Sequence, residues 1–140
     1  MKSVIAFSAL AVIFGLASAL WLSVNNSADD IIITNVPTNV LLPDTLSQNA
    51  QIGKLAFEAK CTSCHGTNAA GRDGVAPPLV HIIYESNHHG DESFQRAVAM
   101  GVQAHHWSFG NMPAVEGLTR GDVMMIIKYI RELQRENGIN

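Results

Sequence analysis

The sequence predicts an all-α protein: a folded domain of three or more helices, preceded by an apolar segment and a linker. Residues 50–138 show helical patterning and almost no strand signal, and residues 4–24 contain no charged side chain. The length of 140 residues suits a single domain. We therefore expect an export or anchor segment at 1–24, a linker at 25–49 and the helical domain at 50–140.

The N-terminal segment has the features of an export signal. Lys2 precedes the uncharged run Val4–Val24, and Ala17-Ser18-Ala19 matches a small-x-small cleavage site, which predicts cleavage after Ala19. A run of this length can also cross a bilayer as an uncleaved anchor, with Trp21 near the interface, and the apolar residues after Ala19 favour this alternative. Both alternatives direct the domain to the periplasmic side of the bacterial inner membrane.

The linker differs in composition from the segments on either side. It is rich in Asn, Ser, Thr and Asp and contains Pro37 and Pro43, which predicts a mostly extended tether. Its apolar groups, Ile31–Ile33 and Leu41–Leu42, are too short for helices. We expect them to form one short strand or to pack on the domain surface.

Two helices are predicted in the first part of the domain. The first covers roughly Ala50–Ala59, and the second covers Asp91–Met100 and ends before Gly101, where a left-handed residue is favoured. The candidate N-caps are Ser47 or Asn49 for the first helix and Asp91 or Ser93 for the second.

The last helix has the clearest signals. It follows Thr119, which has a short acid, Asp122, three positions later, as in a capping box. The apolar residues of this helix form one stripe, Val123, Ile126, Ile127 and Ile130, with Met124 and Tyr129 at the margins.

Long loops at Gly66–Pro78 and Gly110–Gly117 complete the domain. The hydrophobic core is therefore small, and we expect an additional cross-link to stabilise it.

The candidate functional site is Cys61-Thr62-Ser63-Cys64-His65. Two thiols at this spacing, followed directly by a histidine, are typical of covalent c-type haem attachment. One turn of chain brings both sulfurs to one porphyrin edge, and His65 can reach the iron. A zinc site needs a second pair of cysteines, which the sequence lacks, and a redox dithiol is expected in a βαβ setting. We expect one covalent haem c on Cys61 and Cys64, with His65 as an iron ligand.

The second iron ligand is expected among the methionines. Met112 lies in a loop, and Pro113 fixes the backbone directly after it. Because Met112 lies 47 residues beyond His65, it can reach the opposite face of the haem. We expect Met112 to bind the iron; a histidine in its place is the alternative. Three other methionines lie in predicted helices and are expected in the core: Met100, Met124 and Met125.

At this point the chain resembles the class I monohaem cytochromes c over about residues 50–135. Gly53 and Phe57 in the first helix and Tyr129 in the last are similar to the family's helix crossing, where an aromatic packs over a glycine. Cys61, Cys64 and His65 match the haem motif, and Met112-Pro113-Ala114 is similar to the axial-methionine loop. The resemblance implies a cytochrome c-like fold around one haem.

The resemblance also implies contacts around the haem. Ala76-Pro77-Pro78-Leu79 is similar to the family's Gly-Pro-x-Leu, with Ala in place of Gly. By this match Leu79 contacts the haem, and the Pro77 carbonyl accepts a hydrogen bond from His65 Nδ1. The segment Gln103–Asn111 departs from the family because it is unusually rich in histidine and aromatic residues.

Two histidine pairs, His88-His89 and His105-His106, are unusual. Neighbouring side chains of an extended segment point to opposite faces, so we expect each pair to offer one ligand per side and no second metal site. His105, His106 or the Trp107 indole is instead expected to hydrogen-bond a haem propionate. His81 is expected to be a surface or capping residue.

The expected function is electron transfer. Ligation by His65 and Met112 fills both axial positions and raises the reduction potential relative to nitrogen-only ligation. We therefore expect an electron carrier that exchanges single electrons with partner proteins, and not an enzyme. Nine basic and twelve acidic side chains, with no basic cluster, exclude a nucleic-acid partner. The alternatives are a subunit of a membrane oxidoreductase complex, or a haem enzyme or gas sensor with a labile sixth ligand.

Overall fold

The computed structural model describes residues 39–140, and this part of the chain is helical. Within these residues, β-type backbone pairing is limited to two isolated bridges, Arg72–Ala76 and Val102–Met112, so the all-α prediction is confirmed. The helices are α2 (Gln48–Lys60), α3 (Thr62–His65), α4 (Asp91–Met100) and α5 (Arg120–Glu136), with 3₁₀ turns η1 (Thr67–Ala69) and η2 (Ile82–Tyr84).

The predicted leader at 1–24 lies outside the described residues, and so does the linker as far as residue 38. Among residues 39–140, no helix is both long and apolar enough to span a bilayer.

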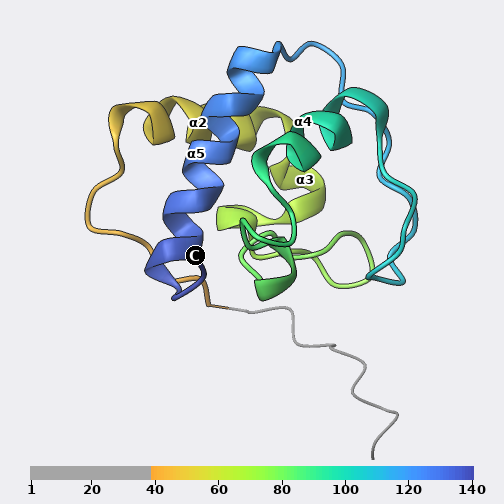
Figure 1. Ribbon diagram of the computed structural model, residues 1–140, viewed down its shortest axis with the longest axis horizontal. Coiled ribbons are helices and arrows are strands. Elements are labelled where there is room, and N and C mark those ends of the chain that lie inside the picture. Colours follow the sequence, from red (N-terminus) through yellow and green to blue (C-terminus); the bar gives the residue numbers. More distant parts are fainter. Residues whose placement is uncertain (1–38) are drawn as a thin grey trace, which may run out of the picture. The chain divides into compact units, whose positions relative to one another are not determined.

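The crossing of α2 and α5 organises the domain (Figure 1). Gly53 allows this close approach, because a Cβ atom there would lie 1.8 Å from the backbone oxygen of Met125. Beside the crossing, the rings of Phe57 and Tyr129 pack with centroids 5.6 Å apart. This is the aromatic and glycine contact that the family resemblance implies.

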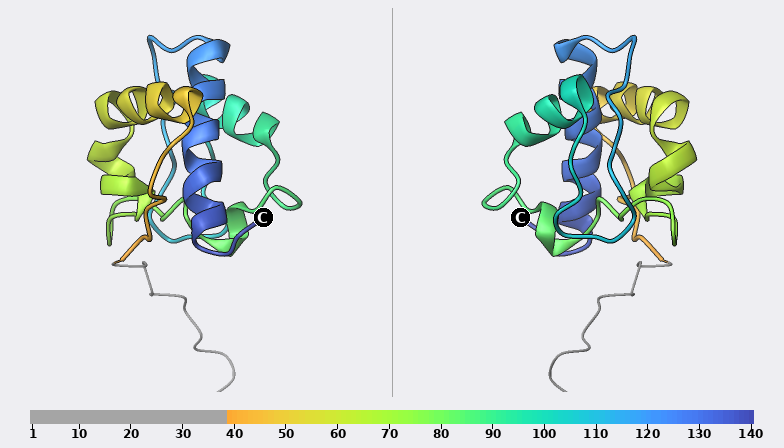
Figure 2. Two further views of the ribbon diagram at one scale, coloured as in Figure 1. Left: turned by 90° about the vertical axis from the view of Figure 1, so that its left-hand side faces the viewer. Right: turned by 90° about the vertical axis from the view of Figure 1, so that its right-hand side faces the viewer.

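Helices α2 and α4 flank α5, as the two side views in Figure 2 show. The predicted stripe of α5 is buried throughout, and Tyr129, expected at its margin, is buried with it. Burial of such side chains stabilises the fold by about 1.5–3 kcal/mol each. The central cluster contains Val40, Ala50, Phe57, Ala69, Leu79, Val80, Ile126, Tyr129, Ile130 and Leu133.

The helix ends agree only in part with the predicted caps. Ser47 caps α2, and Thr119 and Asp122 form the predicted capping box of α5. Helix α4 has the predicted bounds, but its N-cap is Gly90, so both candidate caps are wrong. The reason is that Asp91 accepts a hydrogen bond from Arg131, while the Ser93 hydroxyl donates to the Gly90 carbonyl.

The last part of the predicted linker packs on the domain. Val40 is buried in the core, and the Asn137 side chain forms two 2.9 Å hydrogen bonds with the backbone of Leu41. Ser47 donates from both its backbone and its hydroxyl to the Glu132 carboxylate. The folded unit therefore begins before residue 48, although the side chains of Leu41 and Leu42 are exposed.

Candidate functional site

A cavity of about 560 Å³ lies between α2, α3, α4, α5 and the loop that follows α4. Its volume falls within the range of about 300–1,000 Å³ that is typical of ligand and cofactor sites. Phe57, Ile126 and Ile130 contribute the apolar wall on the side of the core, and Val75 and Met100 are exposed where the cavity opens to solvent. Every predicted site residue lines it: Cys61, Cys64, His65, Pro77, Leu79, Trp107 and Met112.

The two cysteines lie where α2 ends and α3 begins. Cys61 is the C-cap of α2 and the N-cap of α3, and its carbonyl accepts hydrogen bonds from the backbone amides of Cys64 and His65. This single turn presents Cys61, Cys64 and His65 to the same cavity. Burial, and then the neighbouring Cys64, raises the pKa of the Cys61 thiol to about 11.

His65 is buried, and its ring is fixed by the next loop. Its Nδ1 lies 2.9 Å from the Pro77 carbonyl, the hydrogen bond that the family resemblance implies. Since the carbonyl can only accept, Nδ1 carries the proton and Nε2 is left as a free ligand atom. Burial lowers the pKa of His65, and the bond to Pro77 opposes this shift only partly. Gly71, whose amide donates to the His65 carbonyl at 2.7 Å, helps to fold the loop back.

Met112 is held by a backbone pairing that the sequence analysis did not predict. Its amide and carbonyl each form a 2.9 Å hydrogen bond with Val102, directly beyond the end of α4. Gly101 makes room for this pairing, because a Cβ atom there would lie 2.5 Å from the Met112 carbonyl oxygen. Its φ of +77° also favours glycine, which was the available sequence signal. Two backbone contacts, in addition to Pro113, therefore position Met112.

Two methionines differ from the expected core positions. Met100 is 70% exposed and lies at the rim of the cavity, while Met124 is 42% exposed. Both predictions are wrong because a residue in a short helical stretch, or at the margin of a stripe, can face solvent. Met100 and Met112 both border the cavity, but the backbone of Met112 is paired on both sides and that of Met100 ends a helix.

Trp107 presents an unpaired donor beside the cavity. Its Nε1 is buried and finds no hydrogen-bond partner within residues 39–140. Burial raises the pKa of Tyr84 to about 12, and the nearby Trp107 side chain opposes this shift only in part. Because buried donors are nearly always paired, the indole N–H fits a ligand with an acceptor group at this edge.

These residues fit a covalently bound haem. The cavity offers two thiols on one turn, an imidazole with a free Nε2, a thioether on a fixed loop and a buried donor suited to a carboxylate. Its wall is otherwise mainly apolar, as a porphyrin requires.

The two histidine pairs lie together, contrary to the expectation that each pair would point to opposite faces. The Nε2 atoms of His88 and His106 are 3.3 Å apart, and the rings of His89 and His105 lie against them. The pairs belong to compact turns and not to extended strands, so the alternation assumed for strands does not apply. Partial desolvation, and then the three neighbouring histidines, lower the pKa of His106. His81 caps η2 as expected, with Nδ1 accepting from the Ile83 amide.

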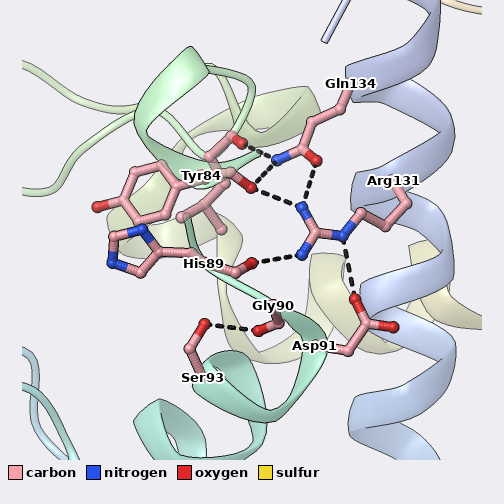
Figure 3. A network of polar contacts seen from close by, with 8 residues as sticks. Tyr84, His89, Gly90, Asp91, Ser93, Arg131 and Gln134 are labelled. Atoms are coloured by element: carbon pink, nitrogen blue, oxygen red, sulfur yellow. Dashed lines mark hydrogen bonds and ion pairs between the residues drawn. The ribbon is translucent and has the colours of Figure 1, made fainter. Parts of the chain in front are cut away.

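Arg131 and Gln134 form a buried polar network that the sequence analysis did not predict (Figure 3). Arg131 donates to the carbonyls of Tyr84 and His89 and to the Asp91 carboxylate. Gln134 donates to the Leu79 and Tyr84 carbonyls. Both residues follow the apolar stripe at helical spacing, which places them on the buried face of α5. A polar side chain there needs buried hydrogen-bond partners, and this was the available sequence signal.

Comparison with known proteins agrees with this geometry. The family model described as cytochrome c matches residues 50–134, more than half of the chain. No curated protein and no solved structure matches the chain.

Proposed function

This chain belongs to the cytochrome c family, and we propose that it is a closed carrier of single electrons in which His65 and Met112 bind the haem iron. The family binds haem c covalently and uses it for electron transfer. The observation that carries the proposal is the single cavity that joins the Cys61–His65 turn to the fixed loop of Met112.

The haem supplies a one-electron couple, and the chain's residues set its surroundings. The thiols of Cys61 and Cys64 attach the group, while Pro77 keeps His65 oriented and increases its basicity. Val102 fixes Met112, whose thioether raises the reduction potential relative to a nitrogen ligand. Ligation by both His65 and Met112 would leave no position on the iron for a substrate, which supports a carrier over an enzyme.

The apolar wall of the cavity would exclude water from a bound haem. Phe57, Ile126 and Ile130 come from the crossed helices and are held by the core. A rigid, low-dielectric pocket favours electron transfer because little reorganisation accompanies the change of charge. The Trp107 indole is available to donate to a haem carboxylate, which would satisfy its buried N–H.

The proposed location is the periplasmic side of the bacterial inner membrane. The support is the uncharged run Val4–Val24, preceded by Lys2, together with a haem type that is attached outside the cytoplasm. We favour an uncleaved anchor, because apolar residues continue beyond Ala19.

The proposed partners are redox proteins with a basic docking patch. The whole chain has a formal charge of −3. Lys2 is the only charged residue in 1–19, so removal of this segment would give a charge of −4 before the haem propionates are counted. An acidic carrier is attracted to basic surfaces, and this attraction weakens as salt rises.

Visible spectroscopy of the oxidised protein tests the ligand assignment. We expect a sulfur-to-iron charge-transfer band that Met112→Ala abolishes. Met100→Leu and Met124→Leu are matched controls, because they remove the other two exposed or rim methionines, and both should retain the band. Loss of the band in Met100→Leu, with retention in Met112→Ala, would assign the ligand to Met100.

A further inference from the structure

A cluster of histidines lies at the edge of the haem cavity, which His89 and His106 line, and the proposed electron-transfer function does not use it. His88, His89 and His106 each offer a ring nitrogen, and these nitrogens all lie within 4.8 Å of one another. The first two belong to the turn before α4 and the third to the loop after it, so two separate segments meet here. His88 and His106 are exposed and His89 is half-buried, which makes the cluster accessible from solvent.

The spacing of the nitrogens suits a metal ion. Zinc binds imidazole nitrogen at about 2.0–2.1 Å, which places two tetrahedral ligands about 3.3–3.4 Å apart. The Nε2 atoms of His88 and His106 are already 3.3 Å apart. The ring of His89 lies beside both, with its centroid 5.3 Å from that of His106 and 4.7 Å from that of His88, and its ligand nitrogen lies within 4.8 Å of theirs.

The ring of His89 is oriented as metal-binding histidines usually are. Its Nδ1 lies 2.6 Å from the Ile83 carbonyl, so Nδ1 carries the proton and Nε2 is free. A hydrogen bond from the second ring nitrogen to a backbone carbonyl is the usual outer contact of a metal ligand.

The turn that carries His88 and His89 is also fixed to the core. Buried Arg131 donates to the His89 carbonyl, as Figure 3 shows, and the amides of His88 and His89 both donate to the Glu85 carbonyl. A preorganised turn loses little conformational entropy when a metal binds.

We propose that His88, His89 and His106 form a second metal site, separate from the haem iron, that binds a divalent transition metal ion of the class that prefers imidazole. Zn²⁺ and Cu²⁺ are the members of this class that three neutral imidazoles suit best. The bound ion leaves a further coordination position for water, and it cross-links the turn before α4 to the loop that leads to Met112.

Calorimetric titration of the haem-loaded, tag-free protein with Zn²⁺ tests the proposal. We expect saturable binding of one Zn²⁺ per chain, and a dissociation constant that rises by about tenfold or more in His88→Gln and in His106→Gln. His81→Asn is the matched control, because it also removes a histidine while Asn can still cap η2, and its affinity should equal that of the wild type.

Thermal unfolding with added Zn²⁺ gives an independent measurement. A metal that binds only the folded state raises Tm with concentration, so we expect this rise in the wild type and in His81→Asn. Substitution with Cu²⁺ should give tighter binding at the same residues. The absence of saturable binding of either ion, or equal affinity in the wild type and the His88→Gln and His106→Gln variants, would overturn the proposal.

The visible spectrum and reduction potential of the haem distinguish this site from a propionate contact. We expect both to be the same in His88→Gln as in the wild type when no metal is added, because His88 does not line the haem cavity. A shifted potential in His106→Gln together with unchanged Zn²⁺ affinity would assign the histidine to the haem instead, and would leave the electron-transfer proposal in place.

Discussion

Gly53 shows how much a single residue contributes to the helix crossing. We expect Gly53→Ala to destabilise the protein by about 3 kcal/mol or more, because the new Cβ would lie 1.8 Å from the Met125 carbonyl oxygen and the helices must separate. The measurement is guanidinium chloride unfolding of the haem-loaded protein.

Gly121→Ala is the control for this prediction. It also places an alanine in α5, but its nearest neighbour is the Thr119 hydroxyl at 3.5 Å. We expect no loss of stability, because the added Cβ meets only ordinary contacts and alanine has the higher helix propensity. Equal losses in the two variants would contradict the role given to the crossing.

Single site residues could be predicted from the sequence where they lie within a short motif. Cys61, Cys64 and His65 line the cavity as a contiguous motif suggests, and the Pro77 contact follows from a resemblance over four residues. Val102, which pairs with Met112, was not predicted, because the pairing joins residues on opposite sides of an irregular loop. Such a contact depends on how the loop closes, which local pattern does not determine.

Arg131 connects helix α5 to the turn before α4 through hydrogen bonds to Tyr84, His89 and Asp91. We expect Arg131→Lys to lower the free energy of unfolding by about 2–4 kcal/mol, because the guanidinium donates to four acceptors and an ammonium has only three N–H groups. Chemical unfolding measures this difference.

The matched control is Arg135→Lys on the same helix. Arg135 is 56% exposed and its nearest acid, Glu132, is 3.9 Å away, so this change should cost about 0.5 kcal/mol or less. A comparable effect of the two substitutions would show that the buried network adds no stability.

Element bounds follow from the sequence where caps and periodicity agree. Helix α4 has the predicted limits, and the α5 capping box is present. The histidine turns were not predicted, since alternation in an extended segment was assumed for residues that form compact turns. The cap of α4 failed for a related reason: Asp91 is engaged by Arg131, a tertiary contact that overrides local preference.

For the whole molecule, the N-terminal segment decides whether the carrier diffuses or stays at the membrane. We expect the intact protein to remain with the membrane fraction in high salt, because burial of about 20 apolar residues is insensitive to ionic screening. N-terminal sequencing should find the chain starting at or near Met1. A start at Leu20 and release into the soluble fraction would instead show a cleaved signal.

Ligation of the haem iron by both His65 and Met112 would make the protein an electron carrier that does not bind small ligands. Carbon monoxide binding to the reduced protein tests this most directly. We expect the wild type to bind carbon monoxide poorly and Met112→Ala to bind it readily, because the variant vacates one axial position. Rapid binding by the wild type would show that the sixth position is open and that Met112 does not hold it.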